Sequence, residues 1–136
     1  KLKDLMKDKI YKLEICGALH YVPLWHNELY FDISKNDLIV QIIPDLVETM
    51  VIGPNNDLAI DYDLHLLDAF NSLTKDIYIG GEKFTINMHE LKMTDQKQVF
   101  TFKNRGILRI NIDDIFDNTN RGDVYIAVKL VPGKYV

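Results

Sequence analysis

The sequence has very little cysteine: Cys16 is the only thiol in 136 residues. A single thiol can form neither an intramolecular disulfide nor a zinc site built from several thiolates. Sparse cysteine is typical of proteins in a reducing compartment. We therefore expect a fold without disulfides and, by default, a cytoplasmic location.

Long hydrophobic runs and an excess of positive charge are also missing. No apolar stretch approaches the roughly 18 residues of a membrane span, and no signal-peptide pattern opens the chain. The net charge of -4 leaves no basic footprint for a phosphate backbone. We expect no membrane and no nucleic-acid partner. Because the first residue is Lys1 rather than Met, we also expect the chain to be a piece of a longer polypeptide.

Motifs for catalysis and for metal or cofactor binding are absent. The four histidines never fall at HxH or HxxxH spacing, and no phosphate-binding glycine loop occurs. Asp57, Asp61 and Asp63 alternate along one strand, which is typical of a solvent-facing side. Asp113, Asp114 and Asp117 lack the order of an EF-hand loop. We therefore expect no enzyme, no metal and no cofactor, and we interpret Cys16 as a small buried thiol.

The chain does contain an internal repeat. The run from Asp37 to Pro44 returns as the run from Asp123 to Pro132, each with an acidic start, an alternating apolar stretch and a proline stop. Leu2, Asp4, Leu5 and Met6 reappear in the same order as Leu66, Asp68, Ala69 and Phe70, and residues 29–31 reappear as 100–102. The spacing between matched segments grows along the chain, as loop insertions would produce. This order predicts two tandem copies of one small β-rich module.

Hydrophobic periodicity predicts many short strands and two short helices. Helical spacing occurs at 2–7 and 66–70. Strands are predicted at 11–15, 19–22, 29–33, 38–43, 58–64, 77–79, 83–88, 99–102, 107–112 and 124–131, with 58–64 as a half-buried antiparallel strand. Turns are expected at 34–36 and at Gly80-Gly81, and a connector at 46–56. The predicted fold is all-β with minor α: two tandem small β-sandwich modules, each with one short helix, at 1–45 and 46–136.

Four motifs in this order carry a family resemblance. They are a Leu-x-Asp-apolar-apolar helix at 2–6 and again at 66–70, Asn56-Asp57-Leu58, the Gly80-Gly81 hairpin with Lys83-Phe84-Thr85-Ile86, and Asn120-Arg121-Gly122-Asp123-Val124 running on to Pro132. Together they resemble the C-terminal client-binding region of DnaJ-type (J-domain, heat shock protein 40) co-chaperones, over most of the chain. The resemblance implies two tandem β-sandwich domains.

The chain also departs from that family pattern. It has no His-Pro-Asp tripeptide, so stimulation of a partner ATPase is not expected from these residues. The cysteine-rich zinc insertion of some members is absent, and residues 46–52 lack the usual linking pattern. By comparison with the family, the first module lacks its first strand, and no dimerisation helix follows Val136.

The resemblance implies a function in protein folding. The chain is expected to hold extended apolar segments of unfolded proteins for delivery to a 70-kDa heat-shock chaperone through the parent protein, with a possible homodimer in that parent. By family position, the client-binding residues are Tyr11, Leu13 and Ile15. An edge strand offers unpaired backbone groups to a client strand. Alternatively, these residues are ordinary core, and the chain is a non-catalytic structural or adaptor β-domain that binds one folded partner.

Overall fold

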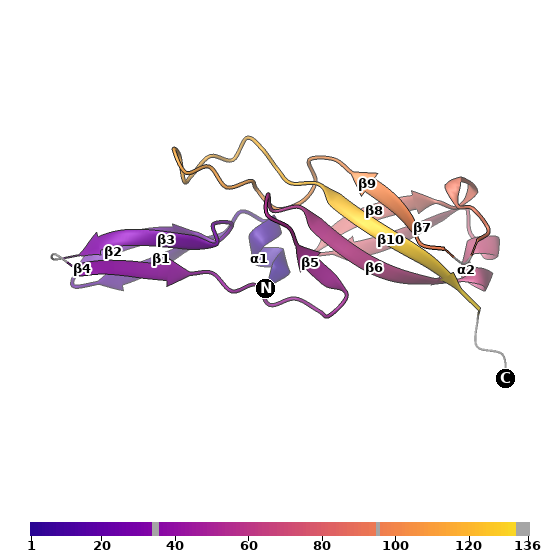
Figure 1. Ribbon diagram of the computed structural model, residues 1–136, viewed down its shortest axis with the longest axis horizontal. Coiled ribbons are helices and arrows are strands. Elements are labelled where there is room, and N and C mark those ends of the chain that lie inside the picture. Colours follow the sequence, from indigo (N-terminus) through magenta and orange to yellow (C-terminus); the bar gives the residue numbers. More distant parts are fainter. Residues whose placement is uncertain (34–35, 95, 133–136) are drawn as a thin grey trace.

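The computed structural model describes residues 1–33, 36–94 and 96–132, with only the backbone of Asn36. The elements are α1 (Leu2–Met6), β1 (Ile10–Ile15), β2 (Ala18–Pro23), β3 (Glu28–Ile33), β4 (Asn36–Gln41), β5 (Met50–Ile52), β6 (Leu58–His65), α2 (Leu66–Asn71), β7 (Thr74–Ile79), β8 (Glu82–Asn87), a 3-10 turn η1 (Met88–Glu90), β9 (Gln98–Phe102) and β10 (Val124–Val131). The molecule is elongated, with β1 to β4 at one end and β5 to β10 at the other (Figure 1). The prediction of an all-β fold with minor α is confirmed.

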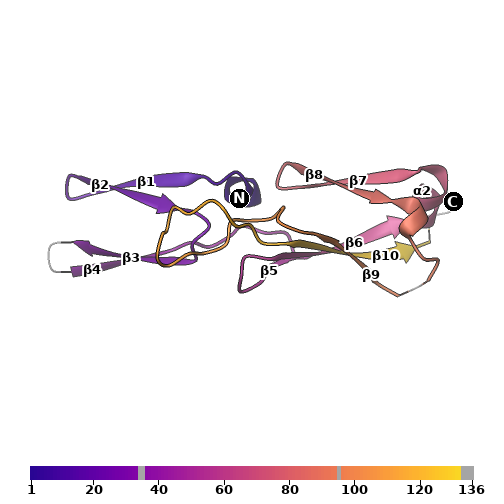
Figure 2. The same cartoon turned by 90° about the horizontal axis from the view of Figure 1, so that it is seen from above.

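The first module consists of two antiparallel hairpins. Strand β1 pairs with β2, and β3 pairs with β4. Figure 2 shows the two hairpins as separate layers that face each other. The β1–β2 turn has two residues, Cys16 and Gly17, with φ of 52° and 79°. Such left-handed backbone at both positions matches the twist of the flanking strands.

The second module is larger, because a four-stranded sheet replaces one of the hairpins. Its strand order is β5-β6-β10-β9, and the β7–β8 hairpin forms the second layer (Figure 2). The turn of that hairpin, Gly80-Gly81, has φ of 59° and 84°, so the predicted glycine turn is confirmed. The antiparallel pairing predicted for the strand at 58–64 is found between β6 and the short β5, but β6 pairs with β10 in parallel, which was not predicted. Alternation predicts one wet face but carries no information on strand direction.

The elements repeat in the same order in both modules. The series α1-β1-β2-β3-β4 returns as α2-β7-β8-β9-β10, with antiparallel pairs at the same places. Aromatic contacts repeat as well. The ring centroids of His20 and Phe31 lie 5.2 Å apart, and those of Phe84 and Phe102 lie 5.1 Å apart. Each pair joins the hairpin layer to the facing layer. One small plan therefore underlies both modules, and within the described residues β5 and β6 are the strands that precede the second copy.

Three local predictions were wrong. Residues 107–112 form no strand apart from one isolated bridge, Leu108 to Arg121. The expected connector at 46–56 contains β5, which is too short to show a period. Cys16 is exposed rather than buried, because it lies at the tip of a hairpin. The predicted turn at 34–36 falls largely outside the described residues.

Polar contacts join the two modules, and a close glycine contact lies beside them within the second module. Asn56 is 2% exposed, and its Nδ2 donates to the carbonyl oxygens of Trp25 and Leu108, at 2.7 Å each. Gly122 lies so close that a Cβ there would come 2.2 Å from the carbonyl oxygen of Asn56. Arg121 donates to Asp8 just beyond α1. The Asn-Arg-Gly segment of the closing motif therefore lies at the junction of the modules.

The main hydrophobic core lies in the second module and extends to the junction. It includes Leu58, Phe84 and Ile126, each 0% exposed, and it takes in Leu5 of α1 and Trp25 of the β2–β3 loop. Helix α1 thus belongs to the first repeat but packs against the core of the second. Within the described residues, no helix is long and apolar enough to cross a membrane.

Candidate functional site

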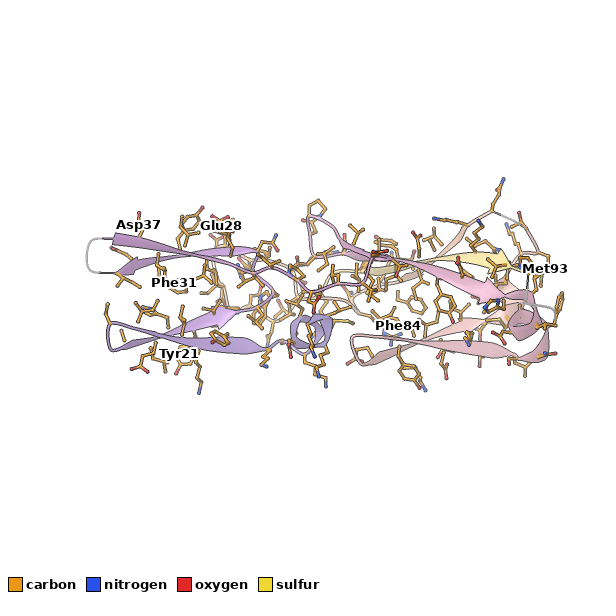
Figure 3. The ribbon with its side chains drawn as sticks, turned by 90° about the horizontal axis from the view of Figure 1, so that it is seen from below. Tyr21, Glu28, Phe31, Asp37, Phe84 and Met93 are labelled. Atoms are coloured by element: carbon orange, nitrogen blue, oxygen red, sulfur yellow. The ribbon has the colours of Figure 1, made fainter. Side chains whose placement is uncertain are left out.

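The apolar surface between the two hairpins of the first module is the candidate site. Residues directly opposite in a hairpin share a face, so Leu13 lies beside His20 and Phe31 beside Leu38. The contact between the His20 and Phe31 rings shows that these two faces meet, and Figure 3 shows Phe31 between the hairpins. We call this surface the inner face; its members are Tyr11, Leu13, Ile15, Ala18, His20, Val22, Leu29, Phe31, Ile33, Leu38 and Val40.

Two residues at the junction end of the inner face are fully buried, whereas the rest of the inner face is less covered. Val22 and Leu29, at the junction end, are 1% and 7% exposed. Further out, most of the inner face is only half-buried. A sandwich of two hairpins has too few strands to cover both of its apolar layers. The inner face therefore keeps apolar area that further polypeptide can bury.

The structure brings the three residues predicted from the sequence onto this face. Leu13 and Ile15 are half-buried and point toward the β3–β4 layer. Tyr11 lies on the same side of β1, and 54% of its surface is exposed. They are therefore neither sealed in a core nor scattered over the surface. The sequence reasoning did not predict the residues on β3 and β4 that face them. The contact between the Phe31 and His20 rings identifies these facing residues.

The strand edges next to the inner face are open within the described residues. Strands β1 and β2 pair only with each other there, and so do β3 and β4. Each strand thus presents a row of N–H and C=O groups on one side. An extended peptide can extend a hairpin by backbone hydrogen bonds whatever its sequence, while apolar side chains at alternate positions enter the space between the layers. This arrangement supports binding rather than bond-breaking chemistry.

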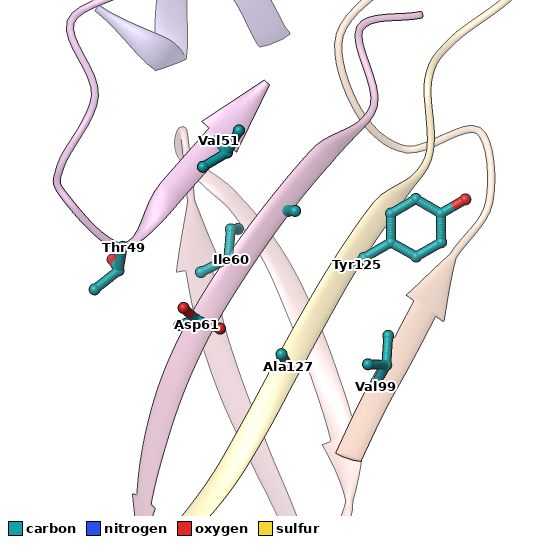
Figure 4. Close-up of a pocket in the computed structure, with 8 residues that line it drawn as sticks. Thr49, Val51, Ile60, Asp61, Val99, Tyr125 and Ala127 are labelled. Carbon is teal, nitrogen blue, oxygen red and sulfur yellow. The ribbon is translucent and has the colours of Figure 1, made fainter. Parts of the chain in front are cut away.

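A second apolar surface lies on the outer side of the four-stranded sheet. It is a shallow groove of about 200 Å³ whose lining includes Ala59 of β6 and Ala127 of β10; Figure 4 shows Ala127 between the strands that flank the groove. Val51 and Val99, each 62% exposed, flank it from the outer strands, and Tyr125 stands at one end (Figure 4). The sequence reasoning did not find this groove, because its two alanines lie on β6 and β10, which become neighbours only when the two strands pair.

Ionisable groups with altered pKa do not gather at one place. Burial lowers the pKa of His26 below its usual value, while a hydrogen bond to the backbone of Ile115 acts in the opposite direction. A hydrogen bond to the Glu28 carboxylate raises the pKa of Tyr30 on the outer side of β3. Among the described residues, no group of three or more His, Cys, Asp or Glu side chains is placed to hold a metal ion. Asp57 accepts a hydrogen bond from the backbone N–H of Asp123, at 2.7 Å, which gives it a structural role.

No protein-family model matches the sequence, and no curated protein matches it.

Proposed function

We propose that this chain is a client-binding region of a DnaJ-type co-chaperone, which holds extended apolar segments of unfolded proteins on the inner face of its first module. One observation carries the proposal: Tyr11, Leu13 and Ile15 lie on a half-covered apolar face whose strands have open edges. The family resemblance in the sequence points to the same three residues independently. Non-catalytic binding with no cofactor fits this surface.

The physical mechanism follows from the two parts of the surface. Open backbone edges provide hydrogen bonds that do not depend on the client's sequence, and the inner face adds a preference for apolar side chains. Ordering a flexible client offsets much of this gain, so each single site binds weakly, at about micromolar affinity or poorer. A homodimeric parent raises the overall affinity by avidity. In this proposal the parent protein works in the cytoplasm and delivers the client to a 70-kDa heat-shock chaperone.

A suppression assay with a matched control tests the proposal. The test variant replaces Tyr11 and Leu13 with threonine, which keeps β-propensity but removes apolar area. The control makes the same change at Leu19 and Tyr21, which lie on the outer side of the same hairpin and are 51% and 45% exposed. We expect the unaltered chain and the control to suppress aggregation of several unrelated unfolded proteins, and the test variant to lose most of this activity.

The same assay separates the adaptor alternative. The outer groove with Ala59 and Ala127 favours that reading, because it is an exposed apolar surface on a well-packed sheet. A dedicated adaptor binds one folded partner and ignores unfolded chains. Equal activity of the test and control variants, or no suppression by the unaltered chain, contradicts the client-binding proposal.

A further inference from the structure

A polar pocket of about 210 Å³ lies where helix α1 meets the second module. Its walls are Met6 of α1, Glu82 at the start of β8, Asn104 and Arg105 just after β9, and Arg121 just before β10. Met6 is buried, whereas Glu82, Asn104 and Arg105 are exposed. These segments are far apart in the sequence and come together because α1 packs against the core of the second module. We call this site the Arg105 pocket.

The guanidinium group of Arg105 is restrained by three contacts. Its central carbon lies 4.4 Å from the ring centroid of Phe84 and 5.6 Å from that of Phe102. Its Nη2 donates to the carbonyl oxygen of Lys83, at 2.6 Å. Aromatic faces attract a guanidinium and hold its plane. Because this group is already positioned, binding a ligand costs less side-chain entropy than it would for a freely moving arginine.

Arg105 has no acidic partner among the described residues. None of the ion pairs found there includes it, and only one of its five N–H donors has a partner there. Arg121 is different, because it pairs with Asp8 and also donates to the carbonyl oxygens of Met6 and Gly106. Arg121 therefore joins segments of the fold, while Arg105 keeps N–H donors for an anion.

The charge balance of the pocket favours a ligand with a single negative charge. The charges of Arg121 and Asp8 offset each other, and Glu82 adds a second carboxylate to the walls. The planar fork of N–H donors on Arg105 matches the two oxygens of a carboxylate. A phosphate group, with about -1.5 to -2 charges at pH 7, is repelled more strongly by Glu82 and Asp8.

The shallow shape of the pocket favours a ligand that is part of a polypeptide. Small-molecule sites enclose most of the ligand surface, whereas most walls of this pocket are exposed. A polypeptide can add contacts outside the pocket. The adjacent surface is basic: Lys83 follows Glu82, and the Cε of Lys7 lies 3.9 Å from the place that a Cβ on Gly81 would take.

We propose that the Arg105 pocket binds a carboxylate group of a polypeptide, with the Arg105 guanidinium as its bidentate partner. The stacked rings of Phe84 and Phe102 hold the guanidinium in place, and Glu82 limits the pocket to one negative charge. This site is separate from the inner face, and the inference does not depend on client binding there.

An NMR titration of the full chain with three short peptides tests the inference. All three peptides have acetylated N-termini. The first carries an internal glutamate and an amidated C-terminus, the second has glutamine in place of the glutamate, and the third is the glutamine peptide with a free C-terminal carboxylate. We expect the first and third peptides to shift the Nε–Hε signal of Arg105, and the second to leave it unchanged. Tighter binding of the first identifies an acidic side chain as the source of the carboxylate, and tighter binding of the third identifies a chain terminus.

Three variants separate carboxylate recognition from the general effect of positive charge. Arg105→Lys keeps the charge but removes the fork and its stacking, and should weaken binding of the glutamate peptide about five-fold. Lys103→Gln removes an exposed cation two residues away and should weaken it by less than about two-fold. Glu82→Gln removes the repelling carboxylate and should tighten binding about two-fold. Backbone amide signals at 104–106 measure the affinity of each variant.

Four results overturn the inference. They are an equal shift with the amidated glutamine peptide, no shift with any peptide, equal weakening by Arg105→Lys and Lys103→Gln, and no gain in Glu82→Gln. The second result would leave Arg105 as a cover for the rings of Phe84 and Phe102 only. Tighter binding of inorganic phosphate than of the glutamate peptide, at the same ionic strength, also overturns the inference. The suppression assay on the inner face tests the proposed function separately.

Discussion

The two modules share one arrangement of strands but differ in how completely their matching side chains are buried. Phe84 and His20 take the same place relative to their hairpin turns, yet Phe84 is 0% exposed and His20 is only half-buried. Ile79 and Ile15 also correspond, and they are 1% exposed and half-buried respectively. The cause is the opposing layer, which has four strands in the second module and two in the first.

This difference separates a well-buried module from a half-covered one. Buried apolar area is the main source of folding free energy, so most of the stability of the chain should come from the second module and the junction. The first module keeps apolar area half-covered, which leaves free energy available for binding.

The largest expected contrast comes from one substitution made in each module. Phe84→Ala should destabilise the chain by about 3–5 kcal/mol, because it leaves a cavity under Phe102 and removes the ring beneath the Arg105 guanidinium. His20→Ala, at the matching place, should cost under about 1 kcal/mol, because half-exposed side chains lose little packing. Chemical denaturation of both variants measures the difference. Equal losses would show that the first module is packed as tightly as the second.

A second test addresses the junction that joins the modules. Asn56→Ala leaves the carbonyl oxygens of Trp25 and Leu108 without their buried donor. The expected loss in the free energy of unfolding is about 1–3 kcal/mol. Asn55→Ala is the neighbouring control, since Asn55 is exposed, and it should change stability by less than about 0.5 kcal/mol. If the junction also stabilises the first module, the rate of amide hydrogen exchange in β1 to β4 should rise in Asn56→Ala.

The third test uses pH and concerns His26 at the same junction. Burial lowers the pKa of His26 in the folded chain, so below about pH 6.5 the unfolded chain binds a proton that the folded chain resists. Stability contributed by neutral His26 is present above that pH and is lost as the pH falls toward the folded pKa, at no more than about 1.4 kcal/mol per pH unit. Denaturation between pH 8 and pH 5 checks this. His26→Gln should flatten the profile.

The smallest expected effect is at the tip of the first hairpin. Cys16 has φ of 52°, which asparagine tolerates better than most residues, and Asn-Gly is a favoured two-residue turn. Cys16→Asn should therefore raise the free energy of unfolding by a few tenths of a kcal/mol, and Cys16→Val should lower it because a β-branched side chain is strained at this φ. Thermal denaturation compares the two variants. Cys16 itself should react with a thiol reagent in the folded chain, since it is exposed.

Sequence patterns predicted the strands better than their partners. Alternation located β1, β3, β4, β6 and β10, because a strand with one apolar side shows its period directly. The period carries no sign of strand direction, so the parallel pairing of β6 with β10 was missed. Residues 107–112 alternate in the same way, but they cross the junction, where Ile107 and Leu108 are buried without forming a ladder.

The candidate site was likewise predicted only in part from the sequence. The sequence predicts Tyr11, Leu13 and Ile15, and their common side of β1 follows from the period of a strand. Whether that side is sealed or open depends on how many strands lie across from it, which no local pattern encodes. The two alanines of the outer groove likewise become neighbours only once β6 and β10 pair.

The order of residues by itself determined the duplication, the period of each main strand and the glycine turn at positions 80 and 81, because these depend on neighbours along the chain. Tertiary structure alone decided that β6 pairs in parallel with β10, that α1 packs against the core of the other module, and how much of the inner face is covered. Those outcomes depend on contacts between residues far apart in sequence, where burial and backbone pairing are shared by whole layers rather than by single segments.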